Sequence, residues 1–119
     1  MIIKKETSLG SISIDKNAIA TLAGNTVSEC YGVVGMASQK YFTDGLCEVL
    51  KIDNYSKGII VSNKEDKLDI DLYIIVSYGI KISEVVNEVQ KNVKYILEKN
   101  LDLPINHVNV FVQGVKVVE

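Results

Sequence analysis

The sequence predicts an α+β fold, a two-layer sandwich in which a mainly antiparallel sheet carries two helices packed on one face. One observation is the order of the apolar patterns along the chain, which runs strands, helix, strands, helix, strand. Another is that no glycine-rich phosphate loop of a nucleotide-binding α/β fold follows a strand. Because its 119 residues contain no linker or repeat, the chain is expected to form one domain over residues 1–119.

The first elements are expected to be strands followed by a helix. Residues 11–14 alternate polar and apolar side chains as a half-buried strand does, and residues 2–5 are expected to precede or extend it. Asp15 stands where a helix N-cap is expected. From there to about Tyr31, apolar residues at steps of three and four predict a buried stripe: Ala18, Ile19, Leu22, Ala23, Val27 and Cys30. Gly32 is predicted to end this helix.

Three strands are expected between the two helices. Residues 47–52 and 58–63 are apolar runs typical of strands, and the polar residues 63–66 predict a hairpin turn. The turn leads into the longest strand, residues 67–78. Its alternate residues form one apolar face: Leu68, Ile70, Leu72, Ile74 and Val76.

The second helix is predicted over residues 82–99, and the last strand over residues 107–118. The helical stripe consists of seven aliphatic residues: Ile82, Val85, Val86, Val89, Val93, Ile96 and Leu97. Asn100 is expected to be a left-handed C-cap, and Pro104 prevents the helix from continuing. The alternation of the last strand changes phase at Gly114, which predicts a β-bulge there.

Composition narrows the classes of function. The chain carries 13 lysines against 15 acidic residues and has no arginine, and its lysines are interleaved with acids. Arginine dominates phosphate and guanine recognition, so nucleic acid is disfavoured as a partner. The N-terminus has no long apolar stretch, which predicts neither a signal peptide nor a spanning helix and favours a cytoplasmic location. Cys30 and Cys47 are then expected to be free thiols, with a disulfide as the less favoured alternative.

No constellation of catalytic or metal-binding residues stands out. His107 has no serine, cysteine or carboxylate at a motif spacing, so a strand-end position is favoured over a catalytic base. Asp69 and Asp71 point to the same side of one strand and could bind a cation, but two carboxylates alone favour a solvated face. Cys30 is expected in the core. The sequence therefore predicts a protein that is not an enzyme and needs no cofactor or metal.

The segment Gly32-Val33-Val34-Gly35 permits two interpretations. A Gly-x-x-Gly loop between helices is how KH domains hold nucleic-acid backbones. Such loops bring basic residues to the phosphates, whereas this one holds valines and is followed by Met36. A tight turn that returns the chain over the core, with the valines and Met36 packed, is therefore favoured over RNA binding.

Several stretches together resemble one family. The run Tyr31-Gly32-Val33-Val34-Gly35-Met36, behind a helix with Ile19 and Ala20, resembles the Gly-Val-x-Gly-Met motif of the alkaline shock proteins of Gram-positive bacteria. Residues 72–79, followed by 82–85 and 89–90, are similar to the family's strand, glycine turn and helix, and residues 108–110 with Val115 complete the likeness. The chain is thus identified as resembling a short member of this family over nearly its whole length.

The resemblance carries expectations about function. It implies a cytoplasmic protein linked to cell-envelope or general stress, with no catalytic residue or cofactor to transfer, and a motif turn at Gly32, Val33, Gly35 and Met36. Some members are held at the membrane by a separate anchor protein, which implies an indirect membrane association. The absence of long charged tails implies a constitutive housekeeping form instead of a stress-induced one.

The outer face of the longest strand suggests how such a protein could act. If both helices cover one sheet face, the other face must contact water or a partner. Tyr73, Ile75 and Phe111 are expected to form an apolar patch there, used for self-association or for a protein partner. The alternatives are that residues 37–58 cover this face, or that the protein is a small ligand- or RNA-binding module with its site between helices and sheet or at the Gly32 to Gly35 turn.

Overall fold

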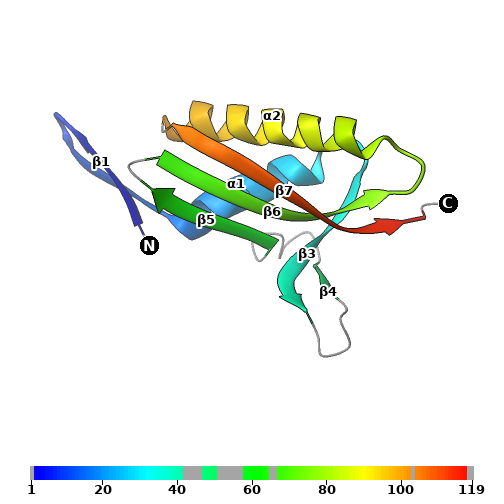
Figure 1. The fold of residues 1–119 in the computed structure, drawn as a ribbon. Coiled ribbons are helices and arrows are strands. Elements are labelled where there is room, and N and C mark those ends of the chain that lie inside the picture. The colour runs from blue at the N-terminus through cyan, green and yellow to red at the C-terminus, as the bar shows by residue number, and fades with distance from the viewer. Residues whose placement is uncertain (1, 42–46, 51–57, 65–66, 103, 118–119) are drawn as a thin grey trace.

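Two helices and seven strands make up the residues that the computed structural model describes, which are 2–41, 47–50, 58–64, 67–102 and 104–117. One strand of the main sheet, over residues 33–41, lies where no strand was predicted; otherwise the strands and helices follow the predicted order (Figure 1). They are β1 (Ile2–Thr7), β2 (Gly10–Asp15), α1 (Lys16–Ser28), β3 (Val33–Tyr41), β4 (Cys47–Leu50), β5 (Ile59–Lys64), β6 (Lys67–Ser77), α2 (Ile82–Leu101) and β7 (Ile105–Lys116).

The main sheet is built around β6. Along one edge of β6, β5 pairs with its first half and β3 with its second half, both antiparallel, and β4 extends the sheet beyond β3. β7 pairs along the other edge and runs parallel to β6, because α2 carries the chain back between the two strands. The predicted mainly antiparallel sheet is therefore confirmed, with one parallel pair inside it.

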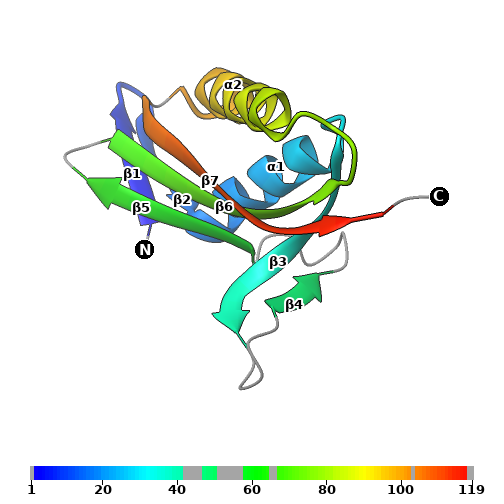
Figure 2. The same ribbon diagram turned by 45° about the vertical axis from the view of Figure 1, so that its right-hand side comes forward.

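Both helices pack on the same face of this sheet, as predicted (Figure 2). The alternate residues of β6 that were expected on one apolar face are all buried against the helices. From α1 they meet Ile19, Ala23 and Val27, and from α2 they meet a stripe of fully buried residues: Val89, Val93 and Leu97. The fold is a two-layer sandwich, and none of its described helices lies on the second sheet face.

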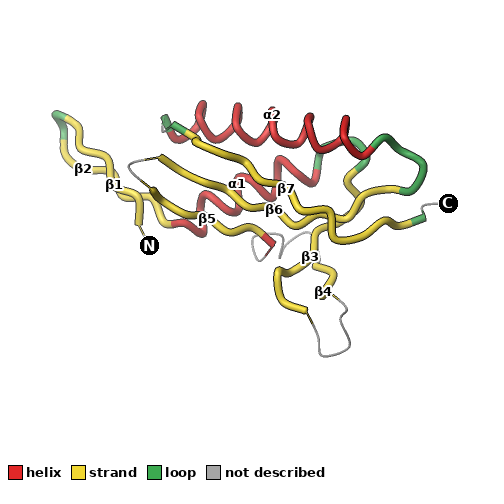
Figure 3. The backbone as a smooth tube through the Cα atoms, viewed as in Figure 1, coloured by secondary structure: helices red, strands yellow, loops and turns green. Residues whose placement is uncertain are grey.

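The first two strands form a separate hairpin. β1 and β2 pair only with each other among the described strands and project from the main sheet (Figure 3). Ile14 packs against the core, whereas Ile12 is exposed, so only the end of the predicted half-buried strand is half-buried.

The first helix is shorter than predicted. Asp15 is its N-cap, as expected, and its side chain accepts a hydrogen bond from the backbone N–H of Asn17 at 3.2 Å. The helix ends at Ser28 with Glu29 as C-cap, three residues before the predicted end at Tyr31. Ala18 is exposed where burial was predicted. The buried residues Ile19, Ala23 and Val27 recur every four positions along the helix. Ala18 precedes Ile19 by one residue, so its side chain is rotated by about 100° around the helix axis, away from the core.

The second helix is longer than predicted. Asn100 is not its C-cap; Asp102 is, with φ of 53° in the left-handed region. The extra turn buries Leu101, whereas Asn100 stays helical and donates its side-chain N–H to the carbonyl of Ile96. The predicted bulge in β7 is confirmed, because Gln113 is the extra residue between the partners of Ile74 and Ile75.

Candidate functional site

The helix-free sheet face brings two of the predicted patch residues into contact. Tyr73 of β6 and Phe111 of β7 are partners in register, and their rings stack with centroids 4.9 Å apart and planes inclined by 14°. Phe111 is 43% exposed, and Tyr73 and Ile75 are half-buried. Ile75 lies beside Gly114, whose missing side chain leaves that flank uncovered. We call Tyr73, Ile75 and Phe111 the sheet-face patch.

The other end of this face is polar. Asp71 accepts a hydrogen bond of 2.9 Å from the side-chain amide of Asn109. Oδ1 of Asp69 lies 3.4 Å from Nδ1 of His107, its register partner on β7, but this buried oxygen has no hydrogen-bond partner among the described residues. The described residues hold no group of three or more potential ligands for a metal ion. His107 is a strand residue that lies beside a carboxylate.

The sequence left open the alternative that residues 37–58 cover this sheet face. Most of that segment lies outside the described residues, because residues 42–46 and 51–57 are not described. Ala37, at its start, is fully buried in β3.

The motif turn has the geometry of a packed connection. Gly32 adopts φ of +87°, and its carbonyl accepts a hydrogen bond of 2.9 Å from the backbone N–H of Ser77. Gly35 and Met36 already belong to β3, where both are buried, and Val33 packs against the core. The Gly-x-x-Gly segment thus joins a helix to a strand, unlike a KH loop between two helices.

Gly32 is also required for close packing. A Cβ placed there would lie 2.6 Å from Cγ2 of Val85 and 2.9 Å from Cδ1 of Ile80, both closer than van der Waals contact. The turn therefore lies directly against the start of α2. This contact explains why the motif and the second helix, which are distant in sequence, form one local structure.

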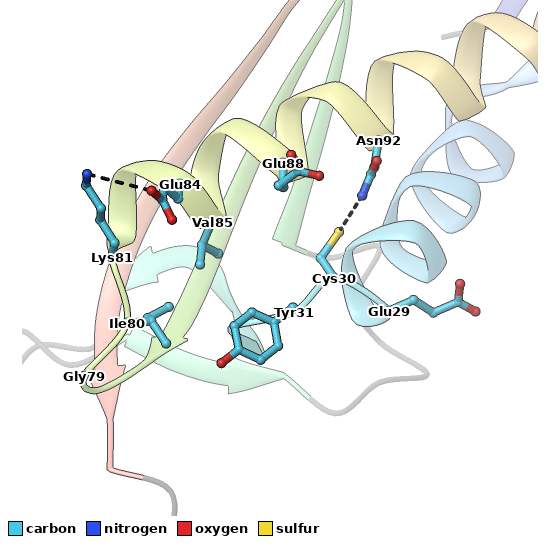
Figure 4. Close-up of a pocket in the computed structure, with 10 residues that line it drawn as sticks. All are labelled: Glu29, Cys30, Tyr31, Gly79, Ile80, Lys81, Glu84, Val85, Glu88 and Asn92. Carbon is cyan, nitrogen blue, oxygen red and sulfur yellow. Dashed lines mark hydrogen bonds and ion pairs between the residues drawn. The ribbon is translucent and has the colours of Figure 1, made fainter.

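A pocket of about 510 Å³ lies beside this turn, between the end of α1 and the first half of α2 (Figure 4). Ile80, Val85 and Cys30 supply apolar surface, and the ring of Tyr31 stands at its edge. Its polar residues come chiefly from α2: Glu84, Glu88 and Asn92, with Lys81 just before the helix and Glu29 at the end of α1. The pocket lies at the ends of the helices, whereas the alternative ligand site was expected between helices and sheet.

Cys30 is a free, buried thiol on the wall of this pocket. It donates a hydrogen bond to the carbonyl of Thr26 at 3.3 Å and accepts one from the side-chain amide of Asn92 at 3.7 Å. Burial raises the pKa of the Cys30 thiol; the Asn92 hydrogen bond opposes that shift, and the charges of Glu88 and Glu29 add to it. A thiol held neutral in this way is a weak nucleophile, which agrees with the predicted core role. The side chain of Cys47 lies outside the described part of the chain.

The residues of this pocket were not predicted as a site. Glu84 and Glu88 are not part of the apolar stripe predicted for the second helix, and Tyr31 appeared only at the predicted end of the first helix and in the family motif. Glu84, Glu88 and Asn92 recur every four residues, a spacing that aligns side chains along one side of a helix. This spacing was the one feature of the sequence that could have indicated a site. It could not indicate that residues at the end of α1 form the opposite wall of the pocket.

Comparison with known proteins identifies the family. The model of the alkaline shock protein 23 family, described as having a cell envelope-related function, matches residues 4–117. The chain belongs to this family. The resemblance of the motif turn, the long strand and the second helix to alkaline shock proteins is thereby confirmed.

Relatives within the family match over almost their whole length. The chain is 46% identical over 117 residues to the uncharacterized protein YloU of Bacillus subtilis (strain 168), which covers 98% of each chain. It is 42% identical over 118 residues to the uncharacterized protein Spy1614 of Streptococcus pyogenes serotype M6, covering 99% of this chain and 98% of the relative. A second Bacillus subtilis protein, the uncharacterized YqhY, is 32% identical over 112 residues, which span 94% of this chain and 82% of YqhY.

No solved structure matches the chain significantly. Among the helices of the described residues, none combines the length and apolarity needed to cross a membrane. The description of the family assigns its members a cell envelope-related function.

Proposed function

We propose that the protein serves its envelope-related function by non-covalent protein contact, without catalysis, and that two copies associate through β7 and the sheet-face patch. The observation that carries the proposal is the exposed stack of Tyr73 on Phe111 beside the edge of the sheet. Large aromatic side chains are enriched at protein interfaces because they bury much apolar area with few rotatable bonds.

The edge position of β7 supports this interface. Among the described strands β7 pairs only with β6, so the other edge of this 12-residue strand faces no further strand. Natural edge strands are protected by lysines, prolines and bulges. In β7 the two register shifts lie at Asn106 and Gln113, and the segment 107–112 between them has neither lysine nor proline. The carbonyl of Val108 in this segment already accepts a hydrogen bond from the side-chain amide of Gln90 on α2. The part of the edge suited to pairing therefore begins after Val108, where it adjoins Phe111 of the patch.

A second copy is the occupant that this geometry favours. Antiparallel pairing of two identical edge strands about a twofold axis satisfies the backbone groups of both copies and presents the same surface from each. It would also bring the two Tyr73–Phe111 stacks onto one continuous sheet face. The polar end of the face, which contains Asp69 and Asp71, would lie at the periphery.

The free thiol of Cys30 supports the cytoplasm as the place where this association occurs, because a reducing compartment keeps thiols unpaired. Attachment to the membrane would then be indirect, through a separate anchor protein that binds this one.

Light scattering coupled to size-exclusion chromatography tests the proposal. Phe111→Glu places a charge in the interface and is expected to shift a dimer to a monomer, while the circular dichroism spectrum stays unchanged because Phe111 is 43% exposed. Leu9→Glu is the matched control, since Leu9 is 99% exposed at the distant hairpin tip. The double variant Tyr73→Glu plus Ile75→Glu should act in the same direction.

Three results would contradict the proposal. The first is a monomeric wild-type protein at all concentrations, and the second is an unchanged mass in Phe111→Glu. The third is loss of the folded spectrum in Phe111→Glu itself, which would make the patch part of the core. Binding of a different protein to the wild type but not to Phe111→Glu would assign the patch to that partner instead.

A further inference from the structure

The helix layer contains a groove that the sheet-face association does not use. The pocket beside the motif turn adjoins a second one of about 240 Å³, and both are lined by Glu29, Cys30 and Asn92. The first pocket follows α2 from its N-cap Lys81 to Asn92 (Figure 4), and the second continues along the helix to Ile96. The end of α1 is the opposite wall of both pockets. At a rise of about 1.5 Å per residue, the stretch from Lys81 to Ile96 is about 22 Å long. We call it the helix groove.

Part of the groove surface is apolar, and an exposed tyrosine lies at each end. Ile80, Val85 and Ile96 contribute aliphatic surface. Tyr31 is 84% exposed and stands free at one end, while Tyr95 is exposed at the other with the ammonium group of Lys99 5.6 Å from its ring centre. Such a surface can hold the aliphatic part of a peptide side chain.

The charge of the groove is one-sided. Its larger pocket is lined by three glutamates and one lysine, a net charge of −2. The whole chain, with 13 lysines and 15 acids, also has a net charge of −2. By formal charge the rest of the chain is balanced, so the excess negative charge lies at the larger pocket, while Lys99 lies beside Tyr95 at the far end of the groove.

Two of these three carboxylates form no ion pair within the described part of the protein. Glu84 and Glu88 are four residues apart on one helix, a spacing at which like charges repel. Lys81 reaches Glu84 at 3.8 Å, but Glu29 and Glu88 form no ion pair with any described residue. The negative charges of Glu29 and Glu88 also act on Cys30, where both raise the pKa of the thiol. A cation in the groove would relieve this repulsion.

We propose that the helix groove binds a cationic amphipathic segment of a partner protein. Apolar side chains of the segment contact Ile80 and Val85, and an arginine or lysine reaches the carboxylates of Glu84 and Glu88. Arginine suits the site best, because its planar fork pairs with carboxylates and stacks on an aromatic ring such as that of Tyr31. This chain contains no arginine, so the charge complementarity argues for a different protein as the source.

The groove and the sheet-face patch are separate surfaces. The groove lies in the helix layer, and the patch lies on the face without helices. A dimer formed through the patch can therefore present two grooves at once. The proposal stands or falls independently of the self-association.

A titration of the isotope-labelled protein followed by NMR tests the groove. The probe is a synthetic 14-residue amphipathic peptide of leucine and arginine, and the control peptide has glutamate at every arginine position. We expect shift changes at Tyr31, Ile80, Glu88 and Asn92, with none at Phe111. Binding should weaken as salt is raised, and the glutamate peptide should not bind.

Matched variants give the result that decides the question. Glu88→Gln removes one groove carboxylate and should weaken binding by about fivefold. Glu6→Gln removes the same charge from the exposed hairpin strand β1 and should leave the affinity unchanged. Shift changes scattered over the surface or centred on Phe111, equal affinities of the two variants, or equal binding of the glutamate peptide would each overturn the proposal. The same titration on Phe111→Glu separates this site from the dimer interface.

Discussion

At the scale of single residues, the motif turn shows how one position can be constrained twice. Gly32 needs a positive φ, and it also needs the space that Val85 and Ile80 occupy at its Cβ position. Gly79 shares the first requirement, with φ of +90°, but nothing lies within 4 Å of its Cβ position. A comparison of the two glycines therefore distinguishes the effect of the backbone conformation from the effect of steric contact.

Gly32→Ala is expected to reduce the free energy of unfolding by about 3 kcal/mol, since both the backbone conformation and the contact with Val85 become unfavourable. Gly79→Ala should lower it by only about 1 kcal/mol, because the backbone term acts alone. Urea denaturation of both variants measures the difference. Equal losses would mean that Val85 and Ile80 move aside without a penalty.

At the scale of elements, α2 joins several parts of the molecule. Its buried stripe holds the sheet, and its polar side chains reach β7, since Gln90 donates to the carbonyl of Val108 at 2.9 Å and Glu98 accepts from the backbone N–H of Ile105 at 3.2 Å. Its left-handed C-cap, Asp102, forms an ion pair with Lys5 of β1. The end of α2 is thus one contact that holds the projecting hairpin, beside the packing of Ile14 against the core.

The ion pair predicts a pH dependence of the hairpin contact. The hydrogen bond from Lys5, and then its positive charge, hold the pKa of Asp102 below its ordinary range. A carboxyl whose pKa is lower in the folded than in the unfolded state stabilises the fold above the unfolded pKa, and this stabilisation is lost as pH falls through the folded pKa. The hairpin contact should therefore weaken only in acid.

An NMR titration of the Asp102 carboxyl measures this effect. In Lys5→Gln its pKa is expected to rise towards the ordinary value, whereas Lys4→Gln, at the exposed neighbouring residue, should change it little. The shift should also shrink at high salt, because the pair is exposed. Identical titration curves in the wild type and in Lys5→Gln would refute the role of this lysine.

At the scale of the whole molecule, β6 is the centre of stability. It is paired on both edges, and its inner residues Ile70, Leu72 and Ile74 are fully buried beneath the helices. The β1–β2 hairpin forms its own two-stranded sheet, and of its described side chains Ile14 packs against the core. Isolated two-stranded hairpins are marginally stable in water.

Hydrogen exchange should reflect this difference. The amides of Ile70, Leu72 and Ile74 are expected to exchange about 100-fold or more slowly than the paired amides of β1 and β2, because the hairpin can open without unfolding the core. Two-dimensional NMR after transfer to heavy water measures both sets in one sample. Equal protection of the hairpin and β6 would show that they open as one unit.

Much of this architecture could be predicted from periodicity. The alternation in residues 67–78, the N-cap at Asp15 and the bulge before Gly114 are local patterns, and each was confirmed. The stripe of the second helix was confirmed from Val85 onward, whereas Ile82, at the first position of the helix, is 40% exposed. The misplaced helix ends have a different origin. Leu101 extends α2 because it can be buried in the core, and a single position beyond a stripe does not reveal that.

The sequence by itself determined the fold class, the family and the face of β6 on which Tyr73 and Ile75 lie, since these depend on side-chain alternation and short motifs. Only the tertiary structure decided that Tyr73 stacks on Phe111, that β7 runs parallel to β6, and that Gly32 touches Val85. The physical reason is distance along the chain. Contacts between residues some 40 or 50 positions apart depend on how complete elements pack, and no local pattern encodes that packing.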